Sequence, residues 1–101
     1  MLYRDYRRIP GYEHYVISNY GEVFSLKRKG VIKTIQLKSF PNPDGYLLVC
    51  LSKDGKVKTT RIHVLVGKAF VGERTGELTF DHIDRDKTNN SADNIRLATK
   101  S

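Results

Sequence analysis

The chain has 101 residues and a formal net charge of +7, with 18 Lys and Arg against 11 Asp and Glu. A chain of this length forms one domain or two very small ones, and its apolar core is modest. No apolar run approaches the roughly 20 residues that a membrane-spanning helix needs, so we expect no membrane partner.

The N-terminus and the cysteine content bear on the cellular compartment. No apolar segment follows the basic residues near the start of the chain, so we expect no secretory signal and an intracellular protein. Cys50 is the single cysteine, which excludes an internal disulfide and a zinc site built from several thiolates. Its position in the apolar run YLLVCLS predicts a small buried side chain.

The positive charge is concentrated in the first two thirds of the chain. Residues 1–68 carry 13 Lys and Arg against 5 Asp and Glu, whereas residues 69–101 carry 5 against 6. This asymmetry is typical of a surface that binds phosphate backbones, although small basic proteins also carry charge for solubility alone. Nucleic acid is therefore the first candidate partner.

The first predicted element is a β-hairpin. Tyr15–Ser18 and Glu22–Leu26 are rich in β-branched and aromatic residues, and they flank the turn formers Asn19-Tyr20-Gly21. A second turn with three cations, Lys27-Arg28-Lys29, follows and ends at Gly30.

A second hairpin follows the breaker cluster Pro41–Gly45. It is predicted from Tyr46–Ser52 to Val57–Thr60, because the Asp54-Gly55 pair between them is among the best short hairpin signals. The first sixty residues therefore predict a small antiparallel sheet with cationic turns. We expect six cations of this part to contact DNA phosphates: Lys27, Arg28, Lys29, Lys53, Lys56 and Lys58.

One short helix is predicted after the sheet. The apolar residues from position 62 recur at helical spacing, with Thr59 or Thr60 able to cap the start and Gly72 to end the helix. The residues at this spacing are Ile62, Leu65, Val66, Ala69 and Phe70.

The polar run FDHIDRDKTNN lies between two further short strands, predicted at Leu78–Phe80 and Ile95–Ala98. Asp81, His82 and Asn94 then lie at facing ends of a hairpin. Successive residues of a regular strand point to opposite faces, so a site that uses both Asp81 and His82 requires a strand end or a bulge there.

These residue types suit phosphodiester hydrolysis. A carboxylate and an amide oxygen are ligands for a hard cation such as Mg²⁺, and a histidine that titrates near neutrality can take a proton from water. Two other interpretations remain for the loop. An EF-hand register is disfavoured, because Asn89 replaces its glycine and Ile95 its bidentate glutamate. A structural role, in which polar side chains satisfy backbone N–H groups, is expected for Asp84, Asp86, Asn89, Asn90 and Asp93.

The run IHVLVGKAFVGERTGELTFDHIDRDKTNNSADNIRLATKS resembles the HNH homing endonucleases of bacteriophages. The stretch YRRIPGYEHYVISNYGEVFSLK resembles the DNA-binding module that often precedes that nuclease core. The resemblance implies an α+β fold, with an antiparallel β module at 1–58 and a ββα-metal (HNH) core at 59–101. It also implies double-stranded DNA as substrate, cut by a nick, in the cytoplasm of a bacterial host.

The resemblance assigns roles to three residues. Asp81 matches the carboxylate ligand of one divalent cation, Mg²⁺ or alternatively Mn²⁺, and His82 matches the general base. Asn94 matches the middle Asn of the motif, whose side chain is expected to orient His82. No small-molecule cofactor is implied. His63 matches a recurrent family position but is expected to be structural, and His14 has no assigned role.

The chain departs from the family pattern at its end, because the family's last metal ligand comes from a helix that lies beyond Ser101. We therefore expect an HNH core that lacks most of its final helix, and a DNA-binding module that cuts weakly or not at all is the alternative function. An RNA-binding domain is a third interpretation, supported only by Tyr3, Tyr6, Tyr12 and Tyr15.

Overall fold

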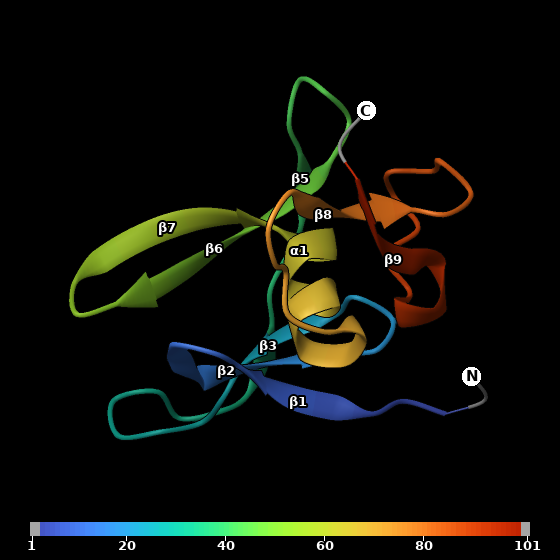
Figure 1. Cartoon of the computed structure of the whole chain (residues 1–101). Helices are drawn as coiled ribbons and strands as arrows, with labels where there is room; N and C mark the ends of the chain where they lie inside the picture. Colours follow the sequence, from blue (N-terminus) through green and yellow to red (C-terminus); the bar gives the residue numbers. More distant parts are fainter. Residues whose placement is uncertain (1–2, 100–101) are drawn as a thin grey trace.

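The computed structural model describes residues 3–99, and in them three small antiparallel sheets surround one short helical segment (Figure 1). The predicted α+β class is confirmed. The strands within these residues are β1 (Tyr6–Ile9), β2 (Tyr12–Ser18), β3 (Val23–Ser25), β4 (Ile35–Gln36), β5 (Phe40–Pro41), β6 (Leu47–Lys53), β7 (Lys56–Arg61), β8 (Leu78–His82) and β9 (Ile95–Thr99).

The first sheet has the order β1-β2-β3-β4 and contains the first predicted hairpin. Val16 of β2 pairs with Phe24 of β3, as the turn between the two strands predicts. Gly21 in that turn has φ +86, a conformation that favours glycine. The cationic turn after β3 is closed by an isolated bridge between Arg28 and Val31.

The second sheet has the order β5-β6-β7, and its β6–β7 hairpin projects to the left in Figure 1. Asp54 and Gly55 have φ +53 and +77, as expected for a two-residue hairpin loop. The prediction that Cys50 is buried is wrong. Its neighbours Val49 and Leu51 face the core, so the alternation along β6 turns Cys50 outward, where it is exposed.

The helix α1 spans Ile62–Val66 and continues as a π-helical turn, η1, over Gly67–Val71. The predicted end at Gly72 is confirmed, because Gly72 directly follows η1. The predicted threonine caps are wrong, because Thr59 and Thr60 belong to β7 and Arg61 is the residue that precedes the helix.

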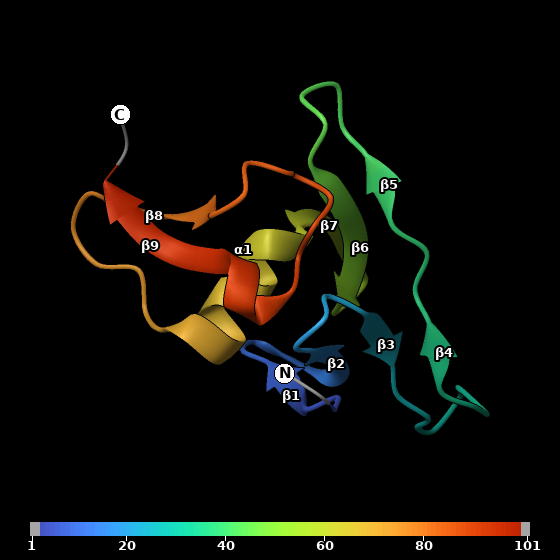
Figure 2. The same cartoon turned by 90° about the vertical axis from the view of Figure 1, so that its right-hand side faces the viewer.

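The third sheet pairs β8 with β9, which lie against α1 and η1 (Figure 2). A short 3-10 helix, η2 (Ala92–Asn94), leads into β9. Gly67 permits the close packing, since a side chain there would overlap the ring of Phe80.

One apolar core joins both predicted parts of the chain. The predicted boundary at residues 58 and 59 falls inside β7, and buried side chains before and after it form a single cluster. The packing therefore does not separate the two predicted modules, and their division by function remains a prediction. The cluster comprises Ile9, Tyr15, Ile17, Val23, Val49, Leu51, Ile62, Leu65, Val66, Phe80, Ala92 and Ile95.

Candidate active site

The candidate site lies at the end of β8, where Asp81 and His82 are adjacent. His82 is buried and Asp81 is half-buried, and their pairing with Arg96 and Ile95 of β9 is regular, without a bulge. Because β8 ends at His82, both residues nevertheless line one cavity of about 620 Å³. The expected strand end is thus the feature that brings the two residues together.

The His82 ring is held by Asn90. The Nε2 atom of His82 lies 2.8 Å from the side-chain oxygen of Asn90, and both side chains are buried. A carbonyl oxygen only accepts hydrogen bonds, so Nε2–H donates this one. The lone pair of the imidazole is therefore on Nδ1, which is the nitrogen able to accept a proton.

Asn94 has a different task from the one expected. Its side chain accepts a hydrogen bond from the backbone N–H of Asp84 at 3.1 Å, and donates to the Asp84 carboxylate and the Asn89 carbonyl. Asn94 thus closes the loop between β8 and β9, whereas the contact with His82 that the sequence assigned to Asn94 is made by Asn90. The sequence predicted only that Asn90 satisfies backbone N–H groups of the loop, so its contact with His82 was not predicted.

Two loop carboxylates, Asp84 and Asp86, have the predicted structural role. Asp84 accepts the backbone N–H of Asp86 at 2.8 Å, and Asp86 accepts both the backbone N–H and the hydroxyl of Thr88. These hydrogen bonds stabilise the charged carboxylates. The pKa of Asp84 is lowered chiefly by the Asn89 amide, and the pKa of Asp86 chiefly by the Thr88 hydroxyl.

Two further rings lie beside His82. The His63 ring of α1 is 4.7 Å from the His82 ring, centroid to centroid, and Tyr46 stacks on His63 at 5.1 Å. His63 was expected to lie outside the site, but the structure places it directly against the candidate base. Tyr46 immediately precedes β6, so the fold brings three rings together from separate elements.

The buried His63 makes the stability of the fold depend on pH. Burial is the main cause that lowers the pKa of His63 from 6.5 to about 4, and the neighbouring His82 and Arg61 side chains lower it further. The unfolded chain therefore binds more protons than the folded chain between these pH values. We expect the unfolding free energy to fall as pH drops from 6.5 to about 4. The slope of the unfolding free energy against pH should reflect at most one extra proton bound by the unfolded chain. Denaturant titrations across this range test it, and His63→Phe, which keeps a ring but cannot titrate, should have a shallower slope.

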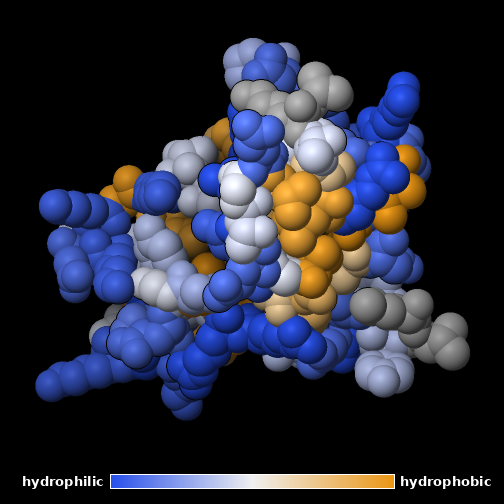
Figure 3. Space-filling model, viewed as in Figure 1, coloured by the Kyte–Doolittle hydropathy of each residue, from blue (hydrophilic) through white to orange (hydrophobic). Residues whose placement is uncertain are grey.

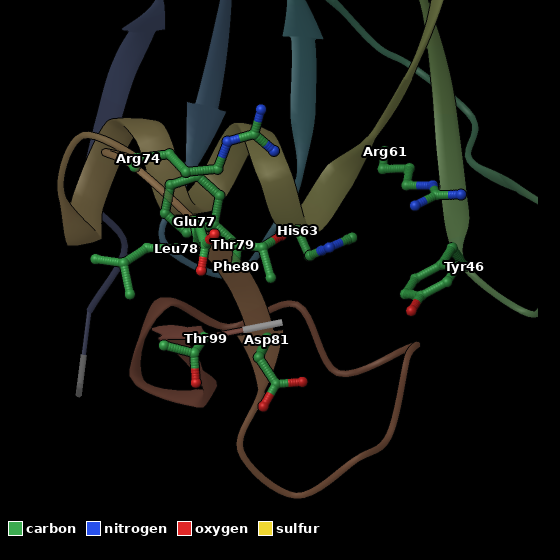
Figure 4. A pocket seen from close by; sticks show the side chains of 11 residues that line it. Tyr46, Arg61, His63, Arg74, Glu77, Leu78, Thr79, Phe80, Asp81 and Thr99 are labelled. Carbon is green, nitrogen blue, oxygen red and sulfur yellow. The ribbon is translucent and has the colours of Figure 1, made fainter. Parts of the chain in front are cut away.

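Two cations lie over Tyr46, which forms a ring cluster with His63 and His82. The guanidinium of Arg61 lies over the Tyr46 ring at 4.6 Å, and the Lys87 ammonium does so at 4.7 Å. Figure 4 shows Tyr46, Arg61, His63 and Asp81 around a second cavity of about 600 Å³. Positive side chains beside a candidate base are suited to a phosphate group.

Two family descriptions match successive parts of this chain. The NUMOD4 motif matches residues 5–52, and the HNH endonuclease family matches residues 60–101. The chain belongs to the HNH endonuclease family. The resemblance to phage HNH homing endonucleases is thereby confirmed.

Two phage proteins are similar over almost all of this chain. DNA endonuclease I-HmuI of Bacillus phage SP01 is 39% identical over 97 residues, covering 95% of this chain and 53% of that protein. The H-N-H endonuclease F-TflII of Escherichia phage T5 is 36% identical, covering 99% and 50%. A solved structure, "DNA binding and cleavage by the HNH homing endonuclease I-HmuI", matches with a TM-score of 0.80 at 42% identity, covering 94% of this chain and 52% of that one. The chain spans about half the length of these two phage proteins.

Asp81 is the residue of this HNH chain that is suited to bind a cation. Its half-exposed carboxylate makes a long contact with Arg96, 3.3 Å from Nη2. Between residues 3 and 99, no group of three or more His, Cys, Asp or Glu side chains converges on one point. A single carboxylate fits a Mg²⁺ ion that completes its shell with water and substrate phosphate.

The cations predicted to bind DNA lie on two neighbouring turns. The Lys27–Lys29 turn and the β6–β7 hairpin are adjacent, since Arg28 and Lys53 line one cavity of about 260 Å³. Arg28 is half-buried and donates to Ser25 and Leu26, whereas the five lysines are exposed. Figure 3 shows hydrophilic residues gathered over the hairpin tip at the left. Within the part of the chain described, no helix is long and apolar enough to cross a membrane.

Proposed function

We propose that this chain is the DNA-binding and catalytic part of a metal-dependent endonuclease that nicks double-stranded DNA. The observation that carries the proposal is the cavity shared by Asp81 and His82, together with the hydrogen bond to Asn90 that fixes the His82 ring. The relatives from phages of bacteria support activity in the cytoplasm of a bacterial host.

Residues in and beside the cavity have separate tasks in this proposal. His82 accepts the proton of the attacking water at Nδ1, because Nε2 already donates to Asn90. Asp81 would hold Mg²⁺ or Mn²⁺. A bound divalent cation supplies stabilisation of the charge that develops on the phosphate and on the departing 3′ oxygen. Arg61 and Lys87, next to the ring cluster, hold the phosphate in reach of His82.

A supercoiled plasmid tests the proposal. Incubation with the protein and Mg²⁺ should convert supercoiled DNA to the open-circular form, and a chelator should prevent the conversion. Mn²⁺ should replace Mg²⁺. Binding without cleavage in both metals would instead support the alternative function, a DNA-binding module that is catalytically weak or inactive.

The cations of the two turns predict a salt-dependent DNA affinity. If Lys27, Arg28, Lys29, Lys53, Lys56 and Lys58 contact phosphates, the logarithm of the affinity falls linearly with the logarithm of the salt concentration. Each Lys→Ala change removes one phosphate contact and should flatten the slope by about 0.9. Fluorescence anisotropy with labelled duplex over a salt series measures this slope.

Lys68, an exposed lysine of η1, provides the control for this measurement. Lys68→Ala removes the same charge from a different part of the surface and should leave the slope unchanged. Equal effects at Lys68 and at the turn lysines would show that the basic surface acts only through its overall charge.

A further inference from the structure

We propose that the turn after β2, residues 18–22, is a positioning element of the active site, and that Gly21 acts on His82 through Asn90. This inference rests on the proposed nuclease function, because cleavage is one of its readouts. It gives the N-terminal part of the chain a second role beside DNA binding.

The turn is rigid. Ser18 and Asn19 are fully buried, with exposed fractions of 0% and 1%. The Ser18 hydroxyl oxygen accepts the backbone N–H groups of Tyr20 and Glu22 at 3.2 and 3.1 Å. The Asn19 side chain accepts the backbone N–H of Asp5 at 2.8 Å and donates to the carbonyl of Tyr3. These hydrogen bonds fix the position of the turn, and so of the residues that pack on it.

The loop between β8 and β9 packs on this turn. The backbone carbonyl of Asn19 accepts the N–H of Ala92 at 2.7 Å. A Cβ atom on Gly21 would lie 2.9 Å from the Cβ atom of Asn90 and 3.2 Å from its carbonyl oxygen. Figure 1 shows the turn between β2 and β3 beside η2. Glycine at 21 is therefore required both by its φ of +86 and by the proximity of Asn90.

The contacts continue into the catalytic cavity. Asn90 is held at its backbone by the packing of Gly21, and two residues later Ala92 is bonded to Asn19. The Asn90 side chain then accepts the hydrogen bond from Nε2 of His82 at 2.8 Å. A shift of the Asn90 backbone by a few tenths of an ångström moves the oxygen that fixes the tautomer and orientation of the base.

Gly21→Ala is the direct test. We expect the single-turnover cleavage rate to fall about 10–100-fold, as for the loss of a residue that orients a catalytic group, with DNA affinity unchanged. Gly11→Ala is the matched control, because Gly11 has φ +81 but no atom lies within 4 Å of the position that a Cβ atom would take there. It imposes the same backbone strain and should leave the rate unchanged.

A second variant removes a different contact between the loop and the turn, in case Gly21→Ala does not fold. Ala92→Pro removes the N–H that donates to Asn19 and adds a ring at a buried position, the first residue of η2, where the helix backbone tolerates proline. The preceding Ser91 has ψ 141, which is compatible with a following proline. This variant should also lower the cleavage rate while the protein stays folded by circular dichroism.

Two readouts separate positioning from packing. In a double-mutant cycle, Gly21→Ala should cost little in an Asn90→Ala background, because the positioning amide is already gone. In ¹⁵N NMR spectra, the wild type should show a slowly exchanging Nε2–H on His82 that both variants lose. Additive effects in the cycle, or an unchanged Nε2–H signal, would overturn the inference. The NMR readout needs no cleavage, so it separates this failure from a failure of the proposed nuclease function.

Discussion

His82→Ala should abolish DNA cleavage while DNA affinity stays within a few fold. Removal of a general base costs about 10²–10⁴ in rate, and the phosphate contacts on the two cationic turns are unaffected. The ring is buried against Asn90 and His63, so the affinity also serves as a check that the variant is folded. Single-turnover cleavage of a labelled duplex, and anisotropy of the same duplex in chelator, measure the two quantities.

His14→Ala is the control for the loss of an imidazole, because His14 is exposed on β2. It should cleave as fast as the wild type. Full activity of His82→Ala would refute the assignment of the base. Loss of activity only in a His63 variant would transfer the role to the second imidazole, which the structure places 4.7 Å away.

The β2–β3 and β6–β7 hairpins could be predicted because their signals are local, whereas β1 and β5 were not predicted. The pair Asp54-Gly55 determines the β6–β7 turn through two residues that adopt positive φ, and the turn around Gly21 does the same for β2 and β3. The prediction for Cys50 is wrong because a continuous apolar run predicts burial of all its residues. The alternation of β6, with Val49 and Leu51 inward, decides its exposure.

The helix start and the ring cluster depend on tertiary structure. Thr60 is a good helix cap by residue type. However, β7 pairs with β6 as far as Arg61, so Thr60 is part of the sheet. His63 lies on an apolar helix, which favours a structural role. Only the positions of Tyr46 and His82 in the fold show that its ring belongs beside the site.

The choice between Asn90 and Asn94 was also beyond the sequence. Both lie in the same polar loop, and both are buried. Their tasks are separated by the path of the loop, which includes a left-handed residue at Arg85, and by the packing of Gly21 from a distant turn. A family motif gives the residue types that a site needs, but the hydrogen-bond partner of His82 follows from long-range contacts.

Asp81→Asn should abolish metal-dependent cleavage at Mg²⁺ concentrations that support the wild type. Even residues that only orient a metal ligand cost about 10–100-fold when removed, so loss of the charged ligand should cost at least about 10²-fold. The change keeps the shape of the side chain. The folded state should be little affected, because the contact between Asp81 and Arg96 is half-exposed and such pairs contribute only about 0–1 kcal/mol.

Direct metal binding separates a ligand from a residue that merely shapes the cavity. Titration of Mn²⁺ into a His82→Ala protein–DNA complex, followed by electron paramagnetic resonance, should show one site that disappears when Asp81→Asn is added. Asp93→Asn, at an exposed carboxylate of η2, should retain both the Mn²⁺ site and, in the otherwise unchanged protein, the cleavage rate. Partial recovery of Asp81→Asn cleavage at high Mg²⁺ is consistent with a weakened ligand, since substrate phosphate and water supply the other oxygens. If Asp81→Asn cleaved DNA at the wild-type rate at low Mg²⁺, another group would hold the cation, and the proposed role of Asp81 would be wrong.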